Sequence, residues 1–223
     1  MNKAVAIIPA RWSSTRFRGK PLHVIGNKPL LQHVFDRCRQ AKNLAAIIVA
    51  TDDMRIAEAA FNWGAEVALT SPRHRSGTDR VAEVARKAKQ FAFVINVQGD
   101  EPLIDPRLID RLVEKLRSTN CQIVTAAHSF ENPEDALSPH QVKVVVDGRG
   151  DALYFSRAPI PFVRSDGFAA KQSERRRLFL RHQGIYGFRR KALLQFVKWK
   201  PTPLERAESL EQKLARAERR KSR

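Results

Sequence analysis

The chain has 223 residues, 43% of them hydrophobic, and its 41 Lys and Arg residues against 23 Asp and Glu residues give a formal net charge of +18. This length and apolar content predict one sizeable α/β core. They exclude a membrane-spanning class, because no apolar stretch is long enough to cross a bilayer. The apolar run at the start is also too short for a signal peptide, so we expect a cytoplasmic protein.

In chain order, short β-branched apolar runs alternate with segments of helical periodicity over the first half. The expected strands are residues 3–9, 45–51, 65–70 and 91–97. The expected helices are residues 29–41, 52–64, 78–90 and 105–116, with Thr78 and Asp105 as N-caps of the last two. Continuous apolar strands separated by helices predict a mostly parallel sheet that is covered by helices on both faces.

The second half has a different pattern, with strands expected in residues 121–130, 140–162 and 182–190. A turn rich in Gly and Asp predicts a hairpin within residues 142–155. Thr202, Pro203 and Glu205 form a capping box with Pro at the first helical position, which predicts a helix in the segment that follows, up to residue 220. Cys38 and Cys121 are far apart in apolar contexts and are interpreted as core thiols.

The positive charge is compatible with nucleic acid, an anionic surface or small polyanionic substrates as partners. Much of the excess lies late in the chain, in residues 173–183 and in a closing run that we interpret as a solvated basic tail over residues 213–223. Aromatic residues do not interleave with the basic ones, and neither a helix-turn-helix nor a zinc-finger spacing occurs. Nucleic acid is therefore the least favoured of the three partners.

Polar segments follow each of the four predicted strands. Ligands of parallel sheets bind at the carboxyl ends of the strands. The segments at those ends are residues 10–20, 51–52, 76–78 and 98–101. The first contains Arg, Ser, Thr, Gly and Lys residues, which suit a chain of phosphates because backbone N–H groups and cations both face the ligand. Neither the Walker A nor the dinucleotide spacing is present, and a solvated basic loop is the alternative.

The order of these segments resembles a known family. Residues 9–22, "PARWSSTRFRGKPL", resemble the signature loop of the sugar nucleotidyltransferases, especially the cytidylyltransferases that activate acidic sugars. Similar segments follow in order: "ATDD", "HRSGTDR", "NVQGDEPLI", "ALYFSRAPIP" and "RHQGIYGFR". Within that family they are most similar to the group acting on 3-deoxy-manno-octulosonate (Kdo) in lipopolysaccharide synthesis. The resemblance runs from residue 4 to about Gln212.

The resemblance implies a Rossmann-like nucleotide-diphospho-sugar transferase fold with a mixed, mostly parallel central sheet. Residues 1–120 would bind CTP, and residues 121–212 would form a small strand-rich part for sugar binding and dimerisation. The anomeric hydroxyl of Kdo would attack the α-phosphorus of CTP and release pyrophosphate, with Mg²⁺ as cofactor. Such a reaction depends on positioning and charge stabilisation rather than on an enzyme nucleophile.

The resemblance also assigns roles to individual residues. The CTP-binding set is Ala10, Arg11, Arg16, Lys20, Ser76, Gly77, Thr78 and Gln98, and the catalytic set is Arg11, Lys20 and Asp100. Asp100 would also bind the metal, because carboxylates suit Mg²⁺ that bridges to phosphates. The sugar-binding set is Arg157, His182, Tyr186 and Glu211. Structural alternatives stay open at this point: a turn cap for Asp100, a helix cap for residues 76–78, and core positions for His182 and Tyr186.

The family pattern continues beyond Glu211 to a Gly-Val-Asp-Thr-Pro turn whose Asp is a second metal ligand, whereas this sequence reads "LEQKLARAERRKSR". We therefore expect the metal site to lack one carboxylate. Two other functions stay open on this ground: a catalytically impaired protein that still binds CTP or an acidic sugar, and a basic protein associated with nucleic acid.

Overall fold

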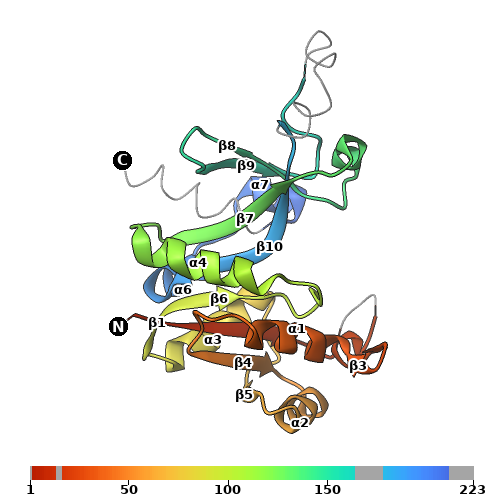
Figure 1. Ribbon diagram of the computed structural model, residues 1–223, viewed down its shortest axis with the longest axis vertical. Helices are drawn as coiled ribbons and strands as arrows, with labels where there is room; N and C mark the ends of the chain where they lie inside the picture. Colours follow the sequence, from red (N-terminus) through yellow and green to blue (C-terminus); the bar gives the residue numbers. More distant parts are fainter. Residues whose placement is uncertain (1, 14–16, 164–177, 211–223) are drawn as a thin grey trace. The chain divides into compact units, whose positions relative to one another are not determined.

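The computed structural model describes residues 2–13, 17–163 and 178–210 (Figure 1). The chain divides into two compact units. Unit 1 comprises residues 1–125 and 184–197, and unit 2 comprises residues 126–183 and 198–223. None of the helices in the described residues has the length and apolar content needed to span a membrane.

The sheet of unit 1 is built from the four predicted strands, each within one residue of its expected ends. They are β1 (Lys3–Ala10), β4 (Ala46–Thr51), β5 (Glu66–Leu69) and β6 (Phe91–Asn96). They lie parallel in the order β5-β4-β1-β6, and β1 is central, with Ile7 opposite both Ile48 and Asn96. The end of β10 (Leu180–Arg189) adds to β6 in the antiparallel direction, with Tyr186 opposite Asn96.

The helices of unit 1 form two groups. They are α1 (Leu30–Arg39), α2 (Met54–Asn62), α3 (Gly77–Lys87), α4 (Pro106–Ser118) and α6 (Arg190–Phe196). Helix α1 packs against α4 and β1, and α3 packs against α6 and β1 (Figure 1). Right-handed crossovers from β1 toward β4 and from β5 toward β6 place these two pairs on opposite faces of the sheet. The predicted mixed, mostly parallel α/β fold is therefore confirmed.

The core of unit 1 follows from the sequence pattern. Residues 4–8 of β1 are completely buried, which fits the uninterrupted apolar run of a strand covered on both faces. Helix α4 buries Ile109, Val113 and Leu116 at helical spacing. Its N-cap is Asp105, as predicted, with Pro106 at the first helical position. The predicted core position of Cys38 is confirmed by its complete burial, and Cys121 is half-buried; both thiols are free.

In unit 2 the predicted hairpin is present as β8 (Lys143–Val146) and β9 (Ala152–Ser156), which pair in the antiparallel direction (Figure 1). The first residues of β10 pair with β8 on its other side. β7 (Ile123–Ser129) runs from unit 1 into unit 2 and pairs with β10, and a short 3-10 helix follows at Pro133–Leu137.

The last described helix is α7 (Pro203–Glu208), and its capping box between Thr202 and Glu205 is present as predicted. The helix ends earlier than the sequence suggested, because Ser209 adopts a left-handed conformation with φ of 50°. Residues from 211 onward lie outside the described residues.

Candidate functional site

Three polar segments of unit 1 meet where the parallel strands end. A Cβ added at Gly77 would lie 3.3 Å from Pro9 Cγ and 3.9 Å from Gln98 Oε1. A Cβ added at Gly99 would lie 2.9 Å from the carbonyl oxygen of Pro9, closer than side chains are observed to approach. Glycine at these positions therefore lets the loops after β1 and β6 and the start of α3 come together.

The start of α3 is fixed by a capping box. The backbone N–H of Asp79 donates to Ser76 Oγ at 3.2 Å, and the backbone N–H of Ser76 donates to Asp79 Oδ2 at 3.3 Å. The N-cap is thus Ser76, and the prediction of Thr78 is wrong, because Gly77 already takes part in the first helical turn. Thr78 is instead buried, with its hydroxyl 3.5 Å from Asn96 Nδ2.

Gln98 lies just beyond β6 and is half-buried. Its Nε2 is 3.5 Å from Asn96 Oδ1, so Thr78, Asn96 and Gln98 form a chain of polar groups along the strand end. The structure therefore brings together the predicted Ser76, Gly77, Thr78 and Gln98. Ala10 is buried at the end of β1, opposite Thr51 of β4.

Lys20 and Asp100 form an ion pair at this edge, with Nζ 2.6 Å from Oδ2, although they are 80 positions apart in the sequence. Both side chains are open to solvent, with exposed fractions of 40% and 50%. The loop reaches this position through a turn at Gly19, whose φ is 74° and whose backbone N–H donates to the carbonyl of Trp12 at 3.0 Å. Arg11, at the start of the same loop, is exposed. Arg16 lies outside the described residues.

Trp12 contacts two neighbours, Gly19 and Arg55, and neither contact was predicted from the sequence. A Cβ added at Gly19 would lie 3.0 Å from the indole, and the guanidinium of Arg55 lies 3.5 Å above the ring centroid. Arg55 in turn binds the Asp53 carboxylate with two nitrogens, and this contact lowers the pKa of Asp53. The stack ties the basic loop to the start of α2.

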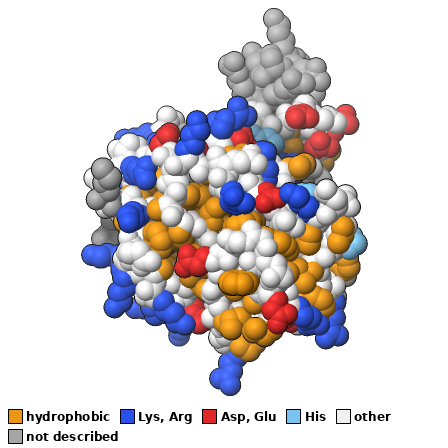
Figure 2. All heavy atoms as spheres, turned by 60° about the horizontal axis from the view of Figure 1, so that its bottom comes forward, with side chains coloured by type: hydrophobic (Ala, Val, Ile, Leu, Met, Phe, Trp, Pro, Cys, Tyr) orange, Lys and Arg blue, Asp and Glu red, His pale blue; other side chains and the backbone are white. Residues whose placement is uncertain are grey.

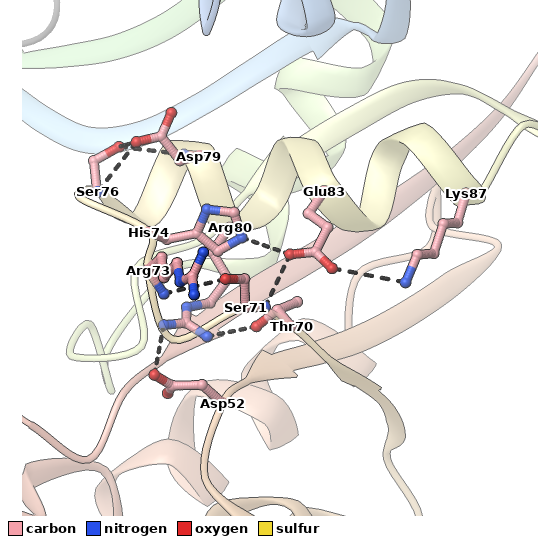
Figure 3. Close-up of polar contacts among 10 residues, drawn as sticks. All are labelled: Asp52, Thr70, Ser71, Arg73, His74, Ser76, Asp79, Arg80, Glu83 and Lys87. Atoms are coloured by element: carbon pink, nitrogen blue, oxygen red, sulfur yellow. Dashed lines mark hydrogen bonds and ion pairs between the residues drawn. The ribbon is translucent and has the colours of Figure 1, made fainter.

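A second group of polar contacts joins α3 to the residues that follow β4 and β5 (Figure 3). Arg80 is only 3% exposed, donates to the Thr70 hydroxyl, and lies 3.2 Å from Asp52 Oδ2. On the next turn, Glu83 accepts from the backbone N–H of Ser71 at 3.0 Å and contacts His74 Nε2 at 2.6 Å. The Ser71 hydrogen bond, followed by the contact with His74, lowers the pKa of Glu83.

In unit 2, Arg157 follows β9 and is held by several hydrogen bonds. Its Nε donates to the carbonyl of Glu208 at 2.9 Å, and its Nη1 donates to the carbonyl of Pro139 at 3.1 Å. Its backbone N–H donates to Glu208 Oε2 at 2.6 Å. Glu208 was not among the predicted residues.

His182, also in unit 2, is buried and packs edge-on against Phe155 with ring centroids 4.9 Å apart. Burial lowers the pKa of His182 to about 4, so the imidazole is neutral at pH 7. Tyr186 belongs to unit 1, where it lies opposite Asn96 and near Phe188. The predicted Glu211 lies outside the described residues.

The surface of the face drawn in Figure 2 carries Lys and Arg side chains in several separate groups, with hydrophobic and acidic side chains between them. Within the described residues no group of three or more His, Cys, Asp and Glu side chains is arranged to hold a metal ion. Asp100, which Glu101 follows in the sequence, has Lys20 as its charge partner at the strand ends.

Known proteins of one family are similar to this chain in sequence. The cytidylyltransferase family profile matches residues 5–221. The 3-deoxy-manno-octulosonate cytidylyltransferase of Marinobacter nauticus is 47% identical over 214 residues, which cover 92% of this chain and 82% of that protein. The enzyme of the same name from Geobacter metallireducens is also 47% identical, with 94% of this chain and 84% of that protein covered.

Solved structures show the same relationship. The structure of a CMP:2-keto-3-deoxy-manno-octonic acid synthetase complexed with CTP has a TM-score of 0.87 and 42% identity, covering 96% of this chain and 85% of that one. A 4-diphosphocytidyl-2C-methyl-D-erythritol synthase from Anaerococcus prevotii shares the fold, with a TM-score of 0.58 at 15% identity, covering 96% of this chain and 82% of that one.

Proposed function

Because the chain belongs to the cytidylyltransferase family, among the 3-deoxy-manno-octulosonate cytidylyltransferases, we propose that it transfers the cytidylyl group of CTP to Kdo. The anomeric hydroxyl of Kdo attacks the α-phosphorus, the bond from that phosphorus to the bridging oxygen breaks, and pyrophosphate leaves. The products are CMP-Kdo, a precursor for lipopolysaccharide synthesis, and pyrophosphate. The observation that carries the proposal is the convergence of Lys20, Asp100 and the capped start of α3 at the strand ends.

Unit 1 binds CTP in this proposal. The start of α3 presents the positive end of the helix dipole, which suits anionic or carbonyl oxygens of a nucleotide. Gln98, with Ser76, Gly77 and Thr78, contacts the base and ribose. Arg11, Arg16 and Lys20 bind the triphosphate, since arginine grips phosphate oxygens with two nitrogens and lysine acts as a point charge on the leaving pyrophosphate.

We propose that Asp100 binds Mg²⁺ together with phosphate oxygens of CTP. The fit rests on the chemistry of the donor: Asp100 is an exposed carboxylate, and its solvent-open ion pair lets Lys20 turn to the triphosphate while the carboxylate binds the ion. Proteins usually hold Mg²⁺ through one or two carboxylates, with substrate phosphates completing the shell. When bound, the ion would neutralise charge that develops on the phosphates.

Unit 2 binds the acidic sugar in this proposal. Arg157 binds the Kdo carboxylate, and the neutral imidazole of His182 offers one N–H to a sugar hydroxyl. We assign Glu211 to the same substrate on the basis of the family resemblance. We also propose that the protein acts in the cytoplasm, where CTP is available and its two cysteines stay as thiols, and that it forms a homodimer.

The test is pyrophosphate release from CTP, Kdo and Mg²⁺, measured beside calorimetric binding of CTP. We expect release that depends on all three components, and none when UTP replaces CTP. CTP binding without pyrophosphate release would favour a catalytically impaired binding protein. No CTP binding, together with salt-sensitive retention on DNA, would favour the nucleic-acid alternative and overturn the proposal.

A further inference from the structure

Glu208, the last residue of α7, is bonded to three residues at or just beyond the end of β9: Tyr154, Ser156 and Arg157. Its Oε1 accepts from the hydroxyls of Tyr154, at 3.1 Å, and Ser156, at 2.8 Å. Its Oε2 accepts from the backbone N–H of Arg157 at 2.6 Å, and its main-chain carbonyl accepts from Arg157 Nε at 2.9 Å. One residue therefore fixes both the backbone and the side chain of Arg157.

Lys143 of β8 binds the carbonyl of Arg157, which belongs to the next peptide group along the chain. Its side chain is completely buried, and its ammonium donates to the carbonyl oxygens of Arg157, Ser138 and Gln141. An ammonium has three N–H groups, so these three bonds use all of them. The N–H of Arg157 is thus bound by Glu208 and its carbonyl by Lys143.

Stability of the fold does not by itself explain why charged groups are used at these positions. Burial lowers the pKa of Lys143, the charge of Glu208 acts in the opposite direction, and the charge of Arg157 lowers it further. Apolar residues of similar volume often give equal or greater stability than buried charges. What charged groups add here is a set of directional bonds that converge on one residue, which fixes its geometry.

The guanidinium of Arg157 stays available for an anion. Both hydrogen bonds that it makes within the described part of the chain go to neutral carbonyl oxygens, of Glu208 and Pro139, rather than to a carboxylate. Those bonds use Nε and Nη1, and Nη2 bonds no described residue. The group is therefore oriented by the protein, and no carboxylate of residues 2–13, 17–163 or 178–210 is paired with its positive charge.

We infer that Glu208 and Lys143 are positioning residues of the acidic-sugar site, which hold Arg157 so that its remaining N–H groups face the substrate carboxylate. The inference rests on the proposed function. It adds two residues, from β8 and α7, whose effect on the sugar passes entirely through Arg157.

The test compares Glu208→Ala with Glu208→Gln, because the amide of glutamine can still accept from the Arg157 N–H and donate to a hydroxyl. Loss of a charge-assisted hydrogen bond predicts that Glu208→Ala raises the KM for Kdo about tenfold or more. The KM for CTP stays within about twofold, since unit 1 is unchanged, and Glu208→Gln stays within about threefold of wild type for both substrates. Equal increases for both substrates, or a glutamine variant as impaired as the alanine variant, would overturn the inference.

A double-mutant cycle with Arg157→Met separates positioning from general support. If Glu208 acts through Arg157, adding Glu208→Ala to Arg157→Met raises the KM for Kdo by less than about twofold more; full additivity would contradict the inference. Should Glu208→Ala fail to fold, Glu208→Asp, which is one methylene shorter, carries the same expectation. Wild-type protein that releases no pyrophosphate would refute the proposed function itself, whereas active wild type with an unaffected Glu208→Ala variant refutes only the positioning role.

Discussion

The side chains of the proposed site are held in place differently in the two units. In unit 1 the charged residues of the proposed site, Lys20 and Asp100, are exposed and are placed by the backbone around glycine. In unit 2 the corresponding residues, Arg157 and His182, are tied to their surroundings by side-chain bonds or burial. Substitution of the exposed Lys20 or Asp100 side chains should therefore change activity without stability, whereas substitution of Arg157 or His182 should change both together.

The strongest test of this contrast is Asp100→Asn. We expect turnover to fall on the order of 100-fold or more, because the proposed Mg²⁺ ligand is lost where phosphate charge develops. The midpoint of thermal unfolding should stay unchanged, because an exposed ion pair contributes little to stability. Steady-state pyrophosphate release and a thermal melt measure the two effects.

The matched control is Asp36→Asn, which removes the carboxylate of another Lys–Asp pair of the same 2.6 Å length, the half-buried pair with Lys28. It should leave both turnover and melting unchanged. Normal turnover of Asp100→Asn would show that the metal assignment is wrong.

The expected pH dependence belongs to unit 2. Burial lowers the pKa of His182 from 6.5 to about 4, so in this range the unfolded state binds a proton that the native state does not. The part of the free energy of unfolding that depends on His182 is therefore greatest above pH 6.5. About 3 kcal/mol of it is lost as the pH falls toward 4. Urea unfolding of wild type and His182→Asn across this range measures the difference. Parallel pH profiles for the two proteins would contradict the prediction.

A steric prediction concerns the backbone contacts of unit 1. In Gly99→Ala the added methyl would lie 2.9 Å from the carbonyl oxygen of Pro9, which forces the two strand ends apart. We expect about 2 kcal/mol of lost stability together with weaker CTP binding, measured by urea unfolding and calorimetry. Gly148→Ala is the control, since nothing lies within 4 Å of its added methyl. If both variants behave like wild type, the strand ends are not held by this close approach.

The sequence predicted much of unit 1 because the relevant signals there are local. Strand runs, helical spacing and the positions of polar segments after each strand are read within a dozen residues, and each was found where expected. The ion pair between Lys20 and Asp100 joins residues 80 positions apart, and only the topology of a parallel sheet explains why they meet.

The supporting residues of both units were not predicted. Arg80 with Asp52, and Glu208 with Arg157, pair across long sequence separations, and no periodicity or spacing marks such a bond in advance. The early end of α7 was also missed, because Ser209 adopts the left-handed conformation that glycine usually supplies at a helix end. The sequence carried one signal for these contacts: charged residues at positions that the helix or strand pattern predicts to be buried.

The smallest expected effect comes from removing the N-cap side chain of one helix in each unit, α3 in unit 1 and α7 in unit 2. Ser76→Ala and Thr202→Ala each remove the side-chain acceptor at a helix N-terminus, which costs about 1 kcal/mol of stability in either case. Their effects on kinetics should differ, because α3 begins at the proposed CTP site and α7 ends at Glu208. We expect Ser76→Ala to raise the KM for CTP and Thr202→Ala to raise the KM for Kdo. Ser76→Thr and Thr202→Ser, which keep a hydroxyl at the cap, should restore stability. An exchange of the two kinetic effects would show that the substrates are assigned to the wrong units.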